Sequence, residues 1–284
     1  IIRKKIEEKY PECRLLGLSY RFVQTVDIDA AWCYLHKGFF RSIMGMLRDA
    51  LVRHDFAEVA RRIRVLHHRE KDPFDSFEYI LNAYEQTPGS TLLFFVLLAD
   101  YGQYDKPTSF FNKHFRQLIQ HLGDYAKMGI HPGYAVNEQP FSADTEIRRL
   151  EEIIHRTIVR SRLHFLRLNL PRSYRILQHV GIKHDYTMGF PDVVGFRAGI
   201  TSSYPFYDLE RDHETELLIH PFCVMDTTLQ KYMQLNPEEG LEHYRMLIDR
   251  VRAVNGTFCC IIHNQNLTDL YGWKGWREFP PSLF

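Results

Sequence analysis

Two carboxylates stand two residues apart at the end of a β-branched run. The run is VQTVDIDAAW, residues 23–32, and the acids are Asp27 and Asp29. Because alternate side chains of a strand share a face, both acids should point the same way at the carboxyl end of the strand. Carboxylates that close together repel each other, raise a pKa or share a cation. The alternative is a turn or an N-cap, since Asp is common where strands stop.

Later strand-like runs also end in residues of acid/base or metal-ligand type. These residues are Asp100, His131, Arg162, His164, Asp185, Asp226 and His263. Parallel α/β folds collect their reactive groups at the carboxyl ends of the strands. Each of these residues alone has a simpler explanation. His131, for example, precedes a proline, and a histidine in that position is often a turn residue. Their convergence on one edge is what predicts a chemical site.

Strand-like and helix-like segments alternate along the chain. The strand candidates are FVQTVDID, TLLFFVLLAD, AKMGIHP, RSRLHFLRL, GIKHDYTMG, LLIHPFCVMD and TFCCIIHNQN. The helix candidates are residues 41–66, 76–84, 110–126, 143–158, 171–180 and 237–254, the last opening on Pro-Glu-Glu. Such alternation indicates βα units and a mainly parallel sheet. The number of units, about seven, predicts a distorted (β/α) barrel of parallel strands rather than an open sheet.

The charge balance argues against two classes of partner. The chain of 284 residues has 36 basic and 35 acidic residues, for a net charge of +1. This balance gives no electrostatic footprint for nucleic acid or for an anionic membrane. The most apolar stretch, TLLFFVLLAD, is of strand length and closes on an acid, so no transmembrane segment is expected.

The cysteines favour a reducing compartment. Their number is odd and their positions, 13, 33, 223, 259 and 260, lack metal-ligand spacing. They are expected to be small buried residues in a cytoplasmic protein. The chain opens in a charged helical stretch without an initiator Met. We therefore expect residues 1–19 to be a helical extension of a chain truncated from a longer protein, and residues 20–284 to be the barrel domain.

Four motifs follow one another in the order of a known family. The first is Thr25-Val26-Asp27-Ile28-Asp29, of the form T-x-D-x-D, and the second is KMGIHPGY with His131. The third is SRLHF with Arg162, followed by YRILQHVGIKHDYTMGF, and the last is CCIIHN with His263. In this order the motifs resemble the polysaccharide deacetylase superfamily with the NodB-type homology domain. GFRAGITSSYPFYDL and HPFCVMDTTL resemble its variant group from bacterial surface-polysaccharide gene clusters.

The resemblance implies a distorted (β/α) barrel that uses a divalent metal to remove an N-acetyl or O-acetyl group from a sugar. The metal is expected to be Zn, with Co, Ni or Mn as alternatives. Asp29 and His131 would hold it, and Asp27 would take a proton from the attacking water. Arg162 would keep Asp27 ionised, and His263 would protonate the departing amine.

One position departs from the family pattern. The second motif usually carries a further metal-binding His four residues after the first, and here that residue is Ala135. His164 is the candidate third ligand, because it follows Arg162 by two residues and therefore shares its face of the strand. A His packed in the core is the alternative, and Glu138 or water would then take its place.

Loop residues after the strands complete the predicted site for an acetylated saccharide. The candidates for substrate contact are Trp32, Tyr134, Arg197, Tyr204, Phe206 and Asn264. Given Ala135, a catalytically silent carbohydrate-binding or scaffold barrel is the alternative function. A different barrel metallohydrolase fits less well, because amidohydrolases usually open with H-x-H where this chain has D-x-D. Retention of the acid/base pair Asp27 and His263 favours the enzyme, and the oligomeric state is left open.

Overall fold

The computed structural model describes residues 2–12 and 19–278. Within these ranges nine strands form one sheet, in the order β6-β7-β5-β4-β3-β2-β1-β9-β8. Neighbouring strands are parallel except for β6 and β7. The strands are β1 (Arg21–Ile28), β2 (Thr91–Val96), β3 (Lys127–Ile130), β4 (Arg160–Ser161), β5 (His184–Asp185), β6 (Tyr204–Asp208), β7 (His213–Ile219), β8 (Val224–Met225) and β9 (Thr257–His263).

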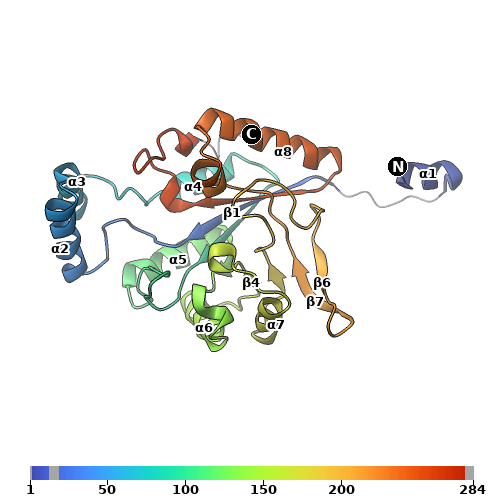
Figure 1. The fold of residues 1–284 in the computed structure, drawn as a ribbon, viewed down its shortest axis with the longest axis horizontal. Helices are drawn as coiled ribbons and strands as arrows, with labels where there is room; N and C mark the ends of the chain where they lie inside the picture. The colour runs from blue at the N-terminus through green and yellow to red at the C-terminus, as the bar shows by residue number, and fades with distance from the viewer. Residues whose placement is uncertain (1, 13–18, 279–284) are drawn as a thin grey trace.

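Eight α-helices occur in the described ranges. They are α1 (Ile2–Lys9), α2 (Phe39–Leu47), α3 (Phe56–Leu66), α4 (Phe77–Glu85), α5 (Lys113–Tyr125), α6 (Phe141–Ile154), α7 (Arg172–His179) and α8 (Pro237–Ala253). Two π-helical stretches, η1 (Arg48–Val52) and η4 (Thr228–Tyr232), and four 3-10 turns, η2 (Tyr134–Asn137), η3 (His164–Leu166), η5 (Asn264–Asn266) and η6 (Trp276–Glu278), join them. Figure 1 shows α4 and α8 above the central strands, α5, α6 and α7 below them, and α2 and α3 away from the sheet.

The central strands are buried on both faces, which explains their continuous apolar sequence. On β2, Leu92, Phe94 and Val96 pack into the cluster that includes Phe115 of α5 and Leu150 of α6. The alternate residues Leu93 and Phe95 belong to a second cluster with Ile261 of β9 and Met225 of β8. The two faces of β2 therefore pack into two different clusters, and the smaller one includes residues of β8 and β9.

The mainly parallel α/β sheet is confirmed, whereas a closed barrel is not. The hydrogen-bonded order begins at β6 and ends at β8, so the sheet is open. The predicted strand LLIHPFCVMD is divided between β7 and β8, and β6 was not expected at all. Strands β4 and β5 have two residues each, so the side of the sheet from β3 to β7 is held by few backbone pairs, and β8 at the opposite edge is equally short.

The helix predictions agree with the structure to within a few residues, with one exception. The segment 41–66 is not one helix, because Asp55 caps the N-terminus of α3 by accepting a hydrogen bond from the backbone N of Glu58. The Pro-Glu-Glu start is confirmed for α8, where Asn236 and Glu239 form a capping box around Pro237.

The expected burial of the cysteines is borne out in part, whereas the division into residues 1–19 and 20–284 stays a prediction. Cys223, Cys259 and Cys260 are buried and unpaired, but Cys33 is partly exposed, and Cys13 lies outside the described residues. The helix α1 lies within the predicted extension, most of whose remainder, residues 13–18, is likewise outside them. Among the described residues, no helix combines the length and apolar character that crossing a membrane requires.

Candidate active site

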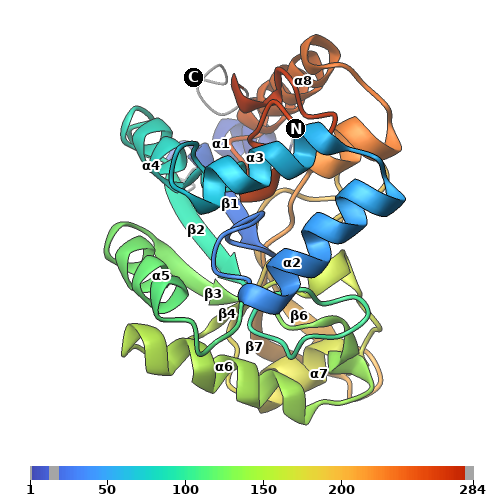
Figure 2. The ribbon, with the colours of Figure 1, turned by 90° about the vertical axis from the view of Figure 1, so that its left-hand side faces the viewer.

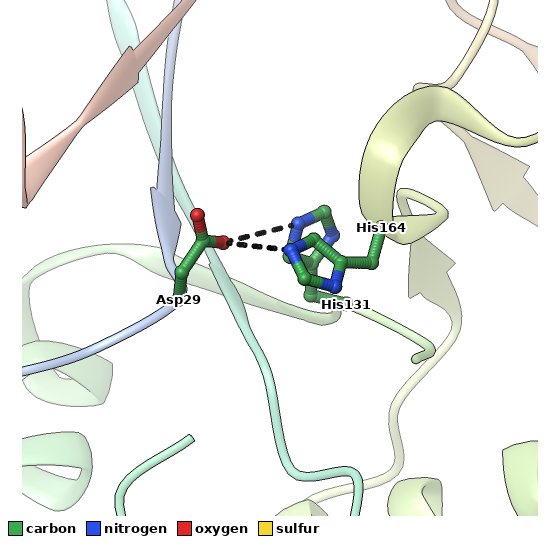
Figure 3. Close-up of side chains that lie close together, drawn as sticks. All are labelled: Asp29, His131 and His164. Carbon is green, nitrogen blue, oxygen red and sulfur yellow. Dashed lines mark ion pairs between the residues drawn. The ribbon is translucent and has the colours of Figure 1, made fainter. Parts of the chain in front are cut away.

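Three side chains from separate parts of the chain converge at the carboxyl edge of the sheet (Figure 3). Asp29 follows β1, His131 follows β3, and His164 begins the 3-10 turn after β4. Asp29 Oδ1 lies 3.4 Å from His131 Nε2 and 3.7 Å from His164 Nε2. All three atoms lie within 4.8 Å of one another, so one cation could contact them together.

The far nitrogen of each imidazole is already engaged. His131 Nδ1 lies 2.5 Å from the carbonyl oxygen of Arg162, and His164 Nδ1 lies 2.6 Å from Asp105 Oδ1. A carbonyl oxygen can only accept, so Nδ1 of His131 donates, and in the neutral ring Nε2 then carries the lone pair. The same reasoning applies to His164 against a carboxylate, which is the usual partner of a metal-ligating histidine.

The donor set fits a divalent metal. Asp29 Oδ1 is buried and has no hydrogen-bond partner in the protein. Burial alone would raise the pKa of Asp29, but the neighbouring His131, His263 and His164 hold it well below the ordinary value. An ionised carboxylate with a free oxygen and two imidazole nitrogens match a common catalytic zinc set, which leaves a coordination position open.

Asp105 is a site residue that sequence reasoning missed. It is a buried loop residue after β2 and accepts hydrogen bonds from the backbone N of Tyr134 at 3.1 Å as well as from His164. Burial would raise the pKa of Asp105, but the bond to His164 lowers it. Asp105 follows no strand directly, so neither strand-end position nor motif spacing singled it out.

The loop around His131 is fixed by a second buried acid. Glu146 of α6 accepts a hydrogen bond from the backbone N of Gly133 at 3.0 Å. A Cβ at Gly133 would lie 2.6 Å from Cβ of Ala99 and 3.0 Å from Asp105 Oδ2, so only glycine fits there without a shift. Burial raises the pKa of Glu146 to about 8.

Asp27 is held by a fully buried arginine. Arg162 Nη1 donates to Asp27 Oδ1 and to Thr25 Oγ1, each at 2.7 Å, and Arg162 Nε donates to the carbonyl of Tyr186 at 3.0 Å. The guanidinium also lies over the ring of Phe95, 4.5 Å from its centroid. The other oxygen, Asp27 Oδ2, lies 3.8 Å from Nε2 of His131, beside the three converging atoms.

His263 also lies near the point where Asp29, His131 and His164 converge. Its Nδ1 is 2.7 Å from Asp226 Oδ1, its backbone N donates to Asp226 Oδ2 at 2.8 Å, and Asn266 donates to that oxygen at 2.9 Å. His263 Nε2 is left facing Asp29 Oδ2 at 4.0 Å. Burial alone would lower the pKa of His263, but Asp226, with smaller effects from Asp29 and Asp27, raises it to about 10.

A cavity of about 370 Å³ opens above these groups. It is lined by Asp27, Asp29, His131, Leu163, His164, Phe165, Leu166, Pro191, Met225, Thr227, Lys231, Tyr232, His263 and Gln265. The exposed rings of Phe165 and Tyr232 and the amide of Gln265 are the groups suited to a polar, ring-shaped ligand. A larger cavity, of about 810 Å³, lies between α6 and α7 and holds none of the converging residues.

The predicted substrate residues do not line this cavity. Trp32 is buried against Phe115, and Asn264 is fully buried, with its amide donating to the carbonyls of Ala30 and Phe74. Neither side chain lines the cavity, so their contact with substrate stays a prediction without support from it.

The remaining four are also not among the residues that line the cavity, although the ring of Tyr134 contacts Phe165, which does line it. Tyr134 stacks on Tyr104, and Arg197 donates to the carbonyl of Gly189. Tyr204 and Phe206 lie on β6 and pack against the main core. Their contact with substrate stays a prediction without support from the cavity.

Ala135 stands where the polysaccharide deacetylase motif has its second metal-binding histidine, and the chain forms a turn there. Ala135 lies in the 3-10 turn η2, and Glu138 just beyond it is exposed and paired with Arg167 at 2.7 Å. Glu138 therefore takes no part in the convergence, whereas His164 does. The packed-core alternative for His164 is not what the structure shows, because its Nε2 faces Asp29.

No family model matches the sequence, and no curated protein matches it. Among solved structures, one from Mycobacterium smegmatis that is assigned as a polysaccharide deacetylase is similar to this chain. The match covers 95% of this chain and 86% of that one, with a TM-score of 0.53 and 14% sequence identity. A Pseudomonas aeruginosa PAO1 protein with the same assignment gives a TM-score of 0.48 at 11% identity, over 93% and 84% of the two chains. The first likeness shows that the chain has a polysaccharide deacetylase type of fold.

Proposed function

We propose that this chain, with its polysaccharide deacetylase type of fold, is a metal-dependent hydrolase that removes an acetyl group from an N-acetylated or O-acetylated saccharide. The observation that carries the proposal is the convergence of Asp29 Oδ1, His131 Nε2 and His164 Nε2 on one point. An arginine-bound carboxylate and a carboxylate-bound imidazole flank that point. The fold supports the saccharide as substrate.

Asp29, His131 and His164 would hold the metal, which when bound makes water a stronger nucleophile and polarises the acetyl carbonyl. Asp27 is the base for that water. Arg162 binds one oxygen of Asp27, so the carboxylate has a fixed direction and its free Oδ2 faces the reacting centre. The water oxygen bonds to the acetyl carbon while its proton passes to Asp27 Oδ2.

His263 is the acid for the leaving group. The bond from Nδ1 to Asp226 holds the ring so that Nε2 faces the cavity, and the raised pKa keeps that nitrogen protonated at neutral pH. As the bond between the acetyl carbon and the sugar nitrogen breaks, Nε2 gives its proton to that nitrogen. The products are acetate and the free amine, and in an ester substrate the proton goes to the sugar oxygen instead.

The test is acetate release from N-acetylglucosamine oligomers and from O-acetylated sugars by protein loaded with Zn, Co, Ni or Mn. The variant Asp27→Asn should retain metal but lose about 10² to 10⁴ in turnover, because general-base catalysis is of that size. Asp144→Asn, a change on α6 at a partly exposed side chain that pairs with Arg148 and does not line the cavity of the site, serves as the control and should match wild type. Wild-type turnover in Asp27→Asn would show that the two acids are assigned wrongly. Absence of bound metal under every loading condition would leave the alternative of a catalytically silent carbohydrate-binding or scaffold protein.

A further inference from the structure

The helical pair made by α2 with η1 and by α3, residues 39–66, has an apolar outer surface. We call this pair the hairpin; Figure 1 shows it standing apart from the sheet, and Figure 2 shows it from its outer side, in front of the strands. No residue of α2 is buried. The exposed apolar residues of the hairpin are Phe39, Phe40, Met44, Leu47, Leu51, Val52, Phe56 and Ile63.

The hairpin keeps its strongest charge pair inside. Asp49 of η1 is 0% exposed and Arg62 of α3 is 6% exposed, and Arg62 Nη2 donates to Asp49 Oδ2 at 2.6 Å. Gly45 makes room for this pair, because a Cβ there would lie 2.7 Å from Arg62 Nη1. A helix in water normally buries its apolar face and exposes its charges. The hairpin instead exposes eight large apolar side chains next to exposed arginines, so its outer face is amphipathic and suited to a boundary between an apolar and a polar medium.

The outer face forms one continuous stripe. Phe40, Met44, Leu47 and Leu51 follow at spacings of four, three and four residues, which places them along one side of a helix. The stripe is about 16 Å long at the usual helical rise. Phe56, at the start of α3, is 69% exposed and extends the apolar surface beyond the end of η1.

The charges of the hairpin decide which partner it fits. Residues 39–66 contain six arginines and three acids, and two of those acids, Asp49 and Glu58, are buried. The side chains of Arg48, Arg53 and Arg64 are 55%, 58% and 48% exposed; the first two share the single acid Asp49, and Arg64 pairs with Glu70. A symmetric contact between two copies would bring these arginines together, which disfavours self-association. An anionic partner would complement them.

We propose that the hairpin docks on an anionic lipid bilayer. The stripe from Phe40 to Leu51 lies in the boundary between head groups and acyl chains, and the arginines contact lipid phosphates. The net charge of the whole chain is only +1, so the excess of arginines over acids in residues 39–66 does not show in it. The expectation of no anionic membrane rested on that net charge. The hairpin follows Asp29 by ten residues, so a docked bilayer lies on the edge of the sheet that carries the site. The proposal does not depend on the proposed hydrolase activity.

The test is co-flotation of the full chain with vesicles of phosphatidylcholine alone or mixed with phosphatidylglycerol. Wild type should float with the mixed vesicles, less with the neutral ones, and less again at high salt because the arginine contacts are screened. The double change Phe40→Ser with Leu51→Ser should lower the partition coefficient more than ~10-fold, because two large apolar side chains no longer insert. Arg41→Gln with Arg48→Gln should weaken binding to the mixed vesicles alone.

The matched control is Leu209→Ser, a leucine in the turn between β6 and β7 that is 86% exposed, more than Phe40 at 75% or Leu51 at 69%, and it should bind as wild type. All changed side chains are exposed, and circular dichroism checks that each variant folds. Failure of wild type to float with mixed vesicles overturns the proposal, as does unchanged binding of Phe40→Ser with Leu51→Ser. Sedimentation showing a wild-type dimer that this double change converts to monomer would assign the stripe to a second copy and also overturn it.

Discussion

At the scale of the residue, the candidate ligands are oriented by the groups on their far side. His131 is oriented by a backbone carbonyl and His164 by Asp105, so both Nε2 atoms face Asp29. The sequence identified the two histidines and the aspartate from their places after strands. It could not identify Asp105, because the contact depends on the path of a loop that no local pattern specifies.

Replacing Asp105 with alanine should weaken metal binding. The ring of His164 would lose the bond that fixes its tautomer and direction, and outer partners of this kind are typically worth 10-fold to 100-fold in metal affinity. The dissociation constant is measured by competition with a chelating dye. Asp100→Ala is the control, since Asp100 is an exposed residue of the same loop that pairs with Arg149. An unchanged dissociation constant would count against His164 as a ligand.

Replacing Asp226 with asparagine should shift the alkaline limb of the rate profile. Burial lowers the pKa of His263, and Asp226 is the main group that raises it to about 10. The acid form is present below that pKa and is lost as pH rises through it. In Asp226→Asn the limb should move toward the ordinary value of about 6.5.

The measurements are kcat/KM against pH and an NMR titration of the His263 ring. Asn keeps an oxygen that can accept from Nδ1 while the charge is removed, but its NH2 group cannot accept from the backbone N of His263 or from Asn266, so the NMR spectrum also checks that the ring stays in place. Asp249→Asn, on the exposed face of α8, should leave the profile unchanged. A limb at the wild-type position in Asp226→Asn would show that His263 is not the acid.

At the scale of the element, long strands were predictable and short ones were not. β1, β2 and β9 have apolar runs that neighbours bury on both faces, so their sequences specify them. β4, β5 and β8 have two residues each and depend on the strands beside them. Loop conformation is likewise not specified by a local sequence pattern. The sequence therefore could not show that Trp32 and Asn264, which follow strands, are buried.

Glu146, which joins α6 to the loop after His131, should make the free energy of unfolding depend on pH. Its pKa in the folded chain is about 8, raised by burial from the ordinary 4.5. The unfolded chain therefore releases this proton first, so stability falls as pH rises from about 4.5 and levels off above the folded pKa. Glu146→Gln removes this titration and can still accept from the backbone N of Gly133.

The difference in thermal stability between Glu146→Gln and wild type should therefore grow in favour of the variant from pH 5 to pH 9. It is measured as the melting temperature in matched buffers. Glu152→Gln on the same helix is the control, because the side chain of Glu152 is 62% exposed. A constant difference across the range would contradict a neutral Glu146 at low pH.

At the scale of the whole molecule, the site unites residues that are far apart in the chain. Asp27 lies in β1 and Asp29 just after it, His131 follows β3, and His263 ends β9, and the order of strands brings them to one edge. Strands β1 and β9 pair directly, so Asp27 stands opposite His263 in register. A ligand that binds at this edge therefore ties the first and last strands to the middle of the sheet.

Metal should accordingly raise the melting temperature of the entire chain. A ligand present at 100 times its dissociation constant stabilises a folded protein by about 2.7 kcal/mol, which for a chain of this size is on the order of 5 to 10 °C. Removal of metal with a chelator should reverse the shift, and Asp29→Ala should melt at the same temperature with and without metal, because its ligand oxygen is gone. Asp249→Asn should respond to metal as wild type does. If Asp29→Ala keeps the full metal-dependent shift in scanning calorimetry, the cation binds somewhere other than the point where Asp29, His131 and His164 converge.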